Sequence, residues 1–176
     1  MPTIFSHAVF AAVTGKAAVN KAGSVWFWLL IAGCAMMPDA DVAAYWFGVP
    51  RGSMFAHRGI THSVFFAVVF GAAIAFFSHR FLPIGFSFLK LWACFALATV
   101  SHPLLDMLTD GGSGAALFAP FSNERFFFPW RPVEVSPIGM GFFSQRGWTV
   151  IASEIIWIWL PAFAVFVAAR IIGKRR

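Results

Sequence analysis

The sequence predicts an all-α fold, a polytopic transmembrane helical bundle with four spans and a short N-terminal apolar helix. Of its 176 residues, 60% are hydrophobic and only 11% are charged. A soluble domain of this size could not bury so much apolar surface. Apolar runs close to 20 residues long recur along the chain, and such runs can cross a bilayer core of about 30 Å. We therefore expect residues 1–176 to form a single integral membrane domain.

The first two apolar segments each bring metal-binding residue types to one of their ends. The segment from Thr3 to Val13 carries His7 and is short for a span, so it is predicted as a tilted span or a re-entrant helix. The next run, from Gly23 to Met37, is expected to stop at the sequence PDAD. Its far end then holds Asp39 and Asp41.

A linker from Trp46 to Gly59 leads into the motif HRGITHS at 57–63. Thr61 has a residue type suited to a helix N-cap, so it is expected to begin the third apolar run, from His62 to Phe77. The fourth run extends from Ile84 to Leu105. Both runs are predicted membrane spans.

The motif SHPLLDMLTDGG at 101–112 closes the fourth run with ionisable residues. His102, Asp106 and Asp110 are spaced i, i+4 and i+8, which on a helix places them along one face. Ionisable side chains in or beside a membrane span are costly and usually functional. This face is therefore the first candidate for a site.

A long connection, residues 111–147, precedes the last predicted span from Trp148 to Ala169. Connections of this length usually cover a site or move. Its Arg125 and Arg131 lie among phenylalanines, a composition typical of the lipid headgroup layer. We expect this loop to cover the site on the non-cytoplasmic face.

The distribution of basic residues predicts the orientation. By the positive-inside rule the basic C-terminus, which ends in Lys174, Arg175 and Arg176, lies in the cytoplasm. Counting back through four spans places Lys16, Lys21 and Arg80 on the same side. The aspartate and histidine motifs at 38–41, 57–63 and 101–112 then share the opposite face. Imidazole and carboxylate together suit Zn²⁺ or Mn²⁺, and two ions would need a bridging carboxylate, for which Asp106 or Asp39 is available.

These motifs resemble the YdjM-like family of bacterial inner-membrane proteins, described as predicted metal-dependent hydrolases. The resemblance rests on His7, PDAD at 38–41, HRGITHS at 57–63, SHPLLDMLTDGG at 101–112, and APFSNERFFFP at 119–129 with SEIIWIWLP at 153–161. It implies a multi-pass inner-membrane location and a metal-dependent hydrolase. The ligand order is also similar to that of zinc-dependent phospholipase C and P1-type nucleases. Carried over by residue, that similarity implies five metal ligands: His7, Asp39, His62, His102 and Asp106.

Those enzymes hold three zinc ions, but this chain has no histidine after His102, so one or two ions are expected here. The predicted reaction is hydrolysis of a phosphoester or lipid-like substrate by a metal-activated water, with Zn²⁺ expected and Mn²⁺ as the alternative. The residues expected to orient the water or leaving group are Asp41, His57 and Asp110. Those expected to hold a phosphate are Arg58, Arg125 and Arg131.

Two other classes use the same residues. A transporter or metal-handling protein would need polar residues toward both faces, whereas here they crowd one face. A non-catalytic structural membrane protein would use the ion to clamp helix ends together. Membrane lipids are the expected partners and nucleic acid is not, because the basic residues form no patch with interleaved aromatics. The sequence does not determine the oligomeric state.

Overall fold

The computed structural model describes residues 1–18, 24–82, 87–137 and 139–174. Throughout these residues the regular structure is helical and no strand forms, apart from two isolated bridges, Thr109 with Val133 and Ala115 with Phe126. The predicted all-α fold is thus confirmed for this part of the chain. Lys21, residues 84–86, Arg175 and Arg176, on which some of the span and orientation predictions depend, lie outside it.

The first apolar segment forms α1 (Ile4–Ala18), which is longer than predicted. The second forms α2 (Val25–Met36) and continues directly into a 3-10 helix, η1 (Met37–Phe47). The α-helix thus ends just before PDAD, as predicted, but helical structure continues beyond it as η1. Pro38 occupies the first turn of η1, where its missing N–H leaves no helix hydrogen bond unmade.

A short 3-10 turn, η2 (Ile60–His62), precedes α3 (Val64–Ser78). The N-cap of α3 is Ser63, whose Oγ accepts a hydrogen bond from the backbone N–H of Phe66. The predicted N-cap, Thr61, lies inside η2 and its hydroxyl donates to Asp41. That N-cap prediction was wrong, and Thr61 instead joins η2 to η1.

The next helix, α4 (Phe88–Asp106), ends at the second residue of the predicted i, i+4, i+8 series. Asp110 lies beyond it, and its backbone N–H donates to the carbonyl of Val133. The prediction that Asp110 shares a helix face with His102 was therefore wrong. The bridge between Thr109 and Val133 directs the chain into the loop instead of another helical turn.

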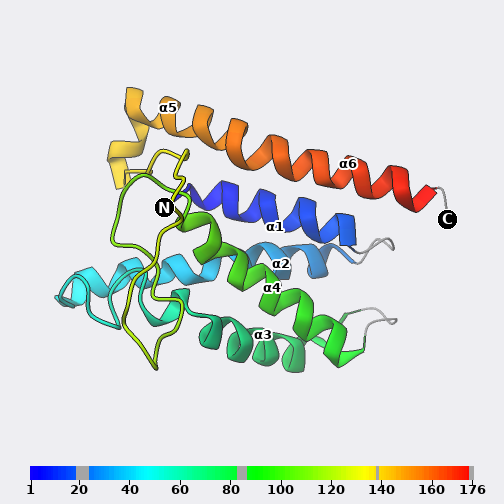
Figure 1. Ribbon diagram of the computed structural model, residues 1–176. Coiled ribbons are helices and arrows are strands. Elements are labelled where there is room, and N and C mark those ends of the chain that lie inside the picture. Colours follow the sequence, from blue (N-terminus) through cyan, green and yellow to red (C-terminus); the bar gives the residue numbers. More distant parts are fainter. Residues whose placement is uncertain (19–23, 83–86, 138, 175–176) are drawn as a thin grey trace.

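The C-terminal segment begins with a 3-10 turn, η3 (Gly139–Phe143), followed by three helical pieces in direct succession. These are α5 (Gln145–Glu154), the π-helical segment η4 (Ile155–Trp159) and α6 (Leu160–Lys174). Together they form one long rod that lies alongside α1 (Figure 1).

Three helical stretches are long and apolar enough to cross a membrane: Val25–Phe47, Phe88–Asp106 and Gln145–Gly173. A fourth predicted span, over residues 62–77, is not confirmed. Helix α3 has 15 residues, and at about 1.5 Å per residue it is shorter than a hydrocarbon core of about 30 Å.

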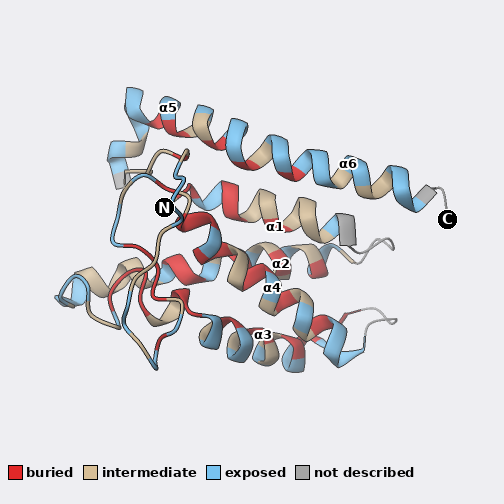
Figure 2. Cartoon of the chain, viewed as in Figure 1, coloured by how far each residue is buried: buried red, intermediate tan, exposed pale blue. Residues whose placement is uncertain are grey.

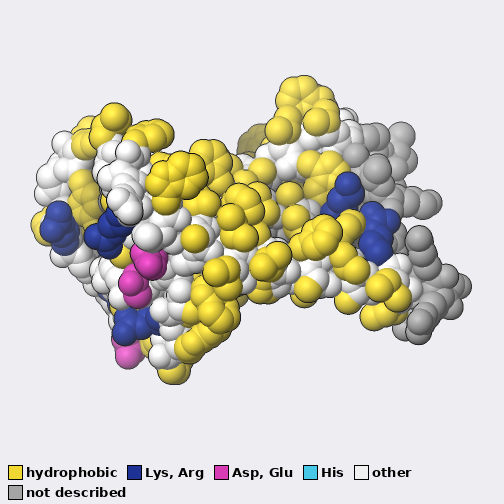
Figure 3. Space-filling view, turned by 90° about the horizontal axis from the view of Figure 1, so that it is seen from above, with side chains coloured by type: hydrophobic (Ala, Val, Ile, Leu, Met, Phe, Trp, Pro, Cys, Tyr) yellow, Lys and Arg dark blue, Asp and Glu magenta, His cyan; other side chains and the backbone are white. Residues whose placement is uncertain are grey.

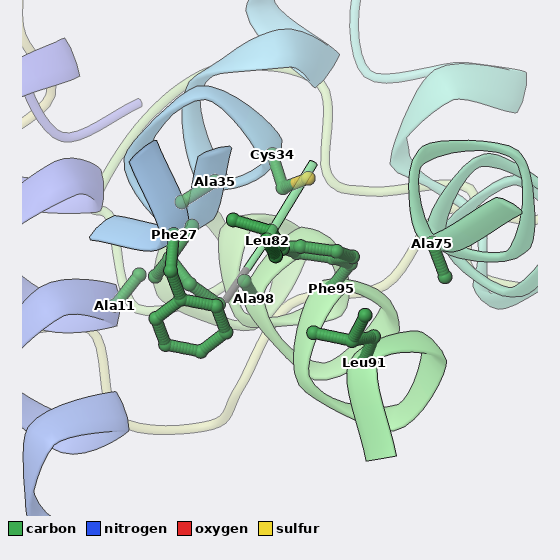
Figure 4. Packing of buried hydrophobic residues seen from close by; sticks show 10 residues of the cluster. Ala11, Phe27, Cys34, Ala35, Ala75, Leu82, Leu91, Phe95 and Ala98 are labelled. Atoms are coloured by element: carbon green, nitrogen blue, oxygen red, sulfur yellow. The ribbon is translucent and has the colours of Figure 1, made fainter. Parts of the chain in front are cut away.

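The apolar core lies between α1, α2, α3 and α4. Phe27 of α2 packs toward Phe95 of α4, with Ala11 and Ala75 contributed by the flanking helices (Figure 4). By contrast, α6 is mostly exposed (Figure 2). In the view of Figure 3, charged side chains lie toward the two ends of the molecule and hydrophobic side chains cover the surface between them, as expected for a protein embedded in lipid.

Candidate metal centre

Five fully or nearly buried ionisable side chains meet where α1, η1, η2 and the end of α4 converge. They are His7, Asp39, His62, His102 and Asp106, of which Asp39 is the most exposed at 8%. These elements lie at the same end of the bundle (Figure 1). The structure thus brings together all five residues that the sequence predicted as ligands.

His102 is oriented by a backbone carbonyl. Its Nδ1 lies 2.7 Å from the carbonyl oxygen of Ala35 on α2, and because a carbonyl can only accept, Nδ1 carries the proton. In the neutral ring the lone pair is then on Nε2, which lies 3.2 Å from Oδ1 of Asp39. Metal-binding histidines are commonly held by such a hydrogen bond from the other ring nitrogen.

His62 is oriented by a carboxylate. Its Nδ1 lies 3.1 Å from Oδ2 of Asp41, while its Nε2 lies 3.7 Å from Asp39 and 3.4 Å from Asp106. The same Asp41 binds Nδ1 of His57 at 2.6 Å. Asp41 therefore holds two imidazoles in place, a position that supports ligands more than it offers a free base.

The spacing of the converging atoms fits a tetrahedral ion. Two ligands about 2.0–2.1 Å from such an ion lie about 3.4 Å apart. The distances from the Nε2 atoms of His62 and His102 to the nearest oxygens of Asp39 and Asp106 are 3.2, 3.4, 3.7 and 3.9 Å. These four residues form one group that could hold an ion, with ligand atoms within 4.8 Å of one another.

Several of the converging atoms have no hydrogen-bond partner within the described residues. They include both oxygens of Asp39, Oδ1 of Asp106, Nε2 of His62 and Nε2 of His102. Leaving buried polar atoms unpaired is costly, and a bound cation is one way to compensate such a group. A divalent cation satisfies a set made of imidazole nitrogens and carboxylate oxygens.

A second group overlaps the first and comprises Asp39, Asp41, His57 and His62. The two groups share Asp39 and His62. His7 belongs to neither, yet its ring stacks on that of His102 at 3.6 Å between centroids, and its Nε2 lies 3.7 Å from Oδ1 of Asp106. Both nitrogens of His7 lack a hydrogen-bond partner within the described residues.

Arg58, predicted to hold a phosphate, is instead buried against Asp106. Its Nε lies 3.0 Å from Oδ2 of Asp106, and its terminal nitrogens donate to Thr109 and to the carbonyl of Gly111. Its backbone has a positive φ of 64°, which is uncommon outside glycine. Arg58 thus neutralises one candidate ligand and ties the HRGITHS motif to the loop.

The remaining predicted residues lie around this group. Arg125 donates to the backbone carbonyls of Ser53, His57, Arg58 and Gly114, and burial lowers the pKa of its guanidinium. Arg131 is exposed and lies over the ring of Phe127. Asp110 is exposed and accepts a hydrogen bond from the N–H of Val135. Neither candidate group includes Asp110.

A buried carboxylate on α5, Glu154, supports the site from outside and was not among the predicted site residues. Its oxygens accept hydrogen bonds from the N–H and hydroxyl of Thr3 and from the hydroxyl of Ser6. Ser6 precedes His7 on α1. An acidic residue in the last apolar run was the only sequence signal, because its partners are about 150 residues away.

The whole chain, residues 1–176, matches the YdjM inner membrane protein family. The chain is also 39% identical to Inner membrane protein YbcI of Escherichia coli (strain K12) over 164 residues, 92% of each protein. No solved structure matches the chain. With its candidate membrane spans and its buried histidine and aspartate groups, the chain belongs to the YdjM family of inner membrane proteins.

Proposed function

We propose that the protein is a membrane-bound hydrolase that uses one or two divalent cations, Zn²⁺ or alternatively Mn²⁺, to cleave a phosphoester or lipid-like substrate. The observation that carries this proposal is the convergence of unpaired, buried nitrogen and carboxylate atoms from four segments. Asp39, His62, His102 and Asp106 would hold the first ion. Asp41 and His57 would complete a second position that shares Asp39 and His62.

A bound divalent cation would lower the pKa of a coordinated water to about 7 and stabilise negative charge on a substrate oxygen. The protein's own residues fix the ligands and exclude bulk water. Asp41 holds the rings of His57 and His62, and the carbonyl of Ala35 holds His102. Arg58 pairs with Asp106 and holds its carboxylate in place.

A cavity of about 380 Å³, here called the polar cavity for its charged and polar wall residues, lies beside this centre and is the proposed entry for substrate. Its walls include Tyr45, Arg51, His57 and Arg58, and its volume is within the range of about 300–1,000 Å³ for small-molecule sites. Arg51 is exposed and lies over the ring of Tyr45. It is better placed than Arg58 to meet an anionic group, because Arg58 already pairs with Asp106.

The proposed arrangement in the membrane keeps the predicted orientation, with the C-terminus in the cytoplasm and the metal centre near the opposite face. Helix α3 crosses most of the bilayer beside α4, as the fourth helix of the bundle. The loop from residue 111 onward covers the centre in this proposal. Arg58 donates to the carbonyl of Gly111 in the loop, and Arg125 of the loop donates to the carbonyl of His57. Arg125 and Arg131 remain proposed phosphate contacts for a substrate that enters under this loop, with Asp110 as a nearby base.

Metal content tests this proposal directly. Elemental mass spectrometry of the detergent-purified protein should find one or two zinc or manganese ions per chain. Folded His102→Ala and Asp39→Asn variants should lose the metal. The control His79→Ala should retain it, because His79 is exposed and follows the C-terminal end of α3. Metal-loaded wild type should cleave a chromogenic phosphodiester. Metal-free wild type, even after reconstitution, would rule out the mechanism.

The near-complete burial of the centre also favours a second function, in which a bound ion clamps the helix ends without turnover. His7, His62, His102 and Asp106 are all 0% exposed. On this alternative the His102→Ala variant would lose stability together with its metal, and the loaded wild type would hydrolyse no substrate. Retained folding with lost activity favours the hydrolase.

A further inference from the structure

Two neighbouring cavities beside the metal centre differ in the side chains that line them. The polar cavity at His57 and Arg51 has a neighbour of about 310 Å³ whose walls are largely apolar and include Ile4, Phe5, Val42 and Phe142. Met1 and Ser136 belong to the walls of both cavities, and the N–H of Ser136 donates to the carbonyl of Met1. The two cavities therefore share part of their walls, and the charged and polar side chains lie on the side of His57 and Arg51.

The apolar cavity reaches the metal centre through Asp39. Asp39 lines this cavity and is one of the two residues shared by both candidate metal groups. His57 of the second group lines the polar cavity. A molecule that occupied both cavities would therefore place its middle beside the shared carboxylate.

The surroundings indicate what kind of molecule this is. Ile4 and Phe5, which line the apolar cavity, are exposed at 39% and 60%. They lie at the start of α1, which is near the N-terminus marked in Figure 1, and in the proposed arrangement this end of α1 lies at the membrane surface. Exposed apolar side chains at this level contact lipid. On the polar side, Arg51 supplies an exposed positive charge. The pair of cavities is thus complementary to an amphiphile with a hydrocarbon chain and an anionic head.

We propose that these cavities form a lipid subsite, in which the apolar cavity takes a hydrocarbon chain and the polar cavity takes an anionic head group near Arg51. The occupant is a membrane lipid, and the bond between head and chain then lies beside Asp39. The subsite rests on the proposed hydrolase in one respect, namely the purpose of the binding, which is to bring a lipid substrate to the ions. Binding itself needs no turnover and can be measured in metal-free protein.

Photo-crosslinking tests the subsite. The full chain is placed in nanodiscs that contain phosphatidylglycerol carrying a diazirine on its acyl chain, with and without metal, and crosslinked residues are mapped by mass spectrometry. Crosslinks should concentrate on the walls of the apolar cavity, at Ile4, Phe5, Val42 or Phe142. An even distribution over the lipid-facing residues of α6 would overturn the proposal.

Two cavity-filling variants sharpen the test. Val42→Trp should reduce crosslinking at the remaining cavity residues about tenfold, because excluding even two methylene groups costs about that factor in binding. Phe142→Trp fills the cavity from the loop side and replaces it if Val42→Trp does not fold. Val165→Trp adds the same bulk to an exposed valine of α6 and should leave these crosslinks unchanged. Equal crosslinking in all variants would exclude the subsite.

The head-group half is tested by comparing phosphatidylglycerol with the zwitterionic phosphatidylcholine. The wild type should prefer the anionic lipid, and Arg51→Gln should lower that preference about threefold, whereas Arg80→Gln at the other end of α3 should not. Metal content is measured on the same samples. If the protein binds metal but shows no crosslinks in the cavity, the subsite is refuted and the hydrolase is not. If the cavity is crosslinked but the protein binds no metal, the subsite is supported and the hydrolase is refuted.

Discussion

Nε of Arg58 lies 3.0 Å from Oδ2 of Asp106, and both side chains are buried. The pair joins the HRGITHS motif to the last residue of α4. Because the charge of Asp106 is compensated on one oxygen, the other oxygen stays available toward His7. The arginine thus has a structural role that a search for phosphate-binding residues would misassign.

Replacing Arg58 with methionine should destabilise the protein by about 3 kcal/mol, because it leaves the Asp106 carboxylate buried without its cation. The loop would also lose its hydrogen bonds at Thr109 and Gly111. Thermal unfolding in detergent measures the effect. Arg131→Met is the control, because Arg131 is exposed and stacks only on Phe127 among the described contacts, and should change stability by less than about 0.5 kcal/mol. Equal stability of both variants would show that the ion pair contributes nothing.

Asp41→Asn should weaken affinity for the first ion, the one proposed to be held by Asp39, His62, His102 and Asp106, about 10- to 100-fold without abolishing its binding. The carboxylate orients His57 and His62 and accepts a hydrogen bond from Thr61, and loss of such supporting groups typically has this effect. Competition with a chromogenic chelator gives the dissociation constant. Asp110→Asn removes an exposed carboxylate that bonds to the N–H of Val135, and it should leave affinity within about twofold. Complete loss of the first ion in Asp41→Asn would make Asp41 a direct ligand of that ion as well.

The sequence allowed accurate prediction where the geometry is local. His102 and Asp106 are four residues apart on one helix, so helical periodicity alone predicts that they face the same way. The end of α4 is not determined locally, because the backbone N–H of Asp110 donates to the carbonyl of Val133, and the N–H of Val133 donates to the carbonyl of Leu108, in a loop that returns more than 20 residues later. For that reason helical periodicity wrongly predicted that Asp110 belongs to α4, whereas it lies beyond the end of this helix.

The roles of the arginines were also beyond the sequence. Nothing in the motif HRGITHS reveals that Arg58 turns inward at a positive φ, or that Arg125 is held by backbone carbonyls of the linker that precedes η2. Glu154 is a similar case, since its hydroxyl partners lie at the opposite end of the chain. The convergence of the five predicted ligands could be anticipated only because helices that span the same membrane end at the same depth, so residues at those ends lie close together.

Glu154→Ala should destabilise the packing of α5 on α1 by about 2 kcal/mol, because it leaves Thr3 and Ser6 with unpaired donors at a buried position. The start of α1 would shift, and His7, which follows Ser6, would shift with it. We expect weaker metal affinity as well as lower stability. Glu154→Gln keeps the shape and two acceptor lone pairs, so it should recover most of both losses.

The control for Glu154 is Glu124→Ala, which removes an exposed carboxylate from the loop. It should change neither stability nor metal affinity measurably. If Glu154→Ala lowers stability but leaves metal affinity at the wild-type value, the link to His7 is wrong and Glu154 serves only to join the two helices.

The close approach of α3 and α4 depends on Gly71. A Cβ at this position would lie 2.6 Å from the backbone nitrogen of Ala96, nearer than real Cβ contacts allow, so Gly71→Ala must separate the two helices. We expect a loss of about 2 kcal/mol, measured by thermal unfolding in detergent.

Gly33 on α2 makes the matched control, because a Cβ there meets nothing within 4 Å. Gly33→Ala should be neutral or stabilising by up to about 1 kcal/mol, since alanine restricts the unfolded chain. If Gly71→Ala behaved like Gly33→Ala, α3 would not pack against α4 at this distance, and its placement as the fourth helix of the bundle would fail.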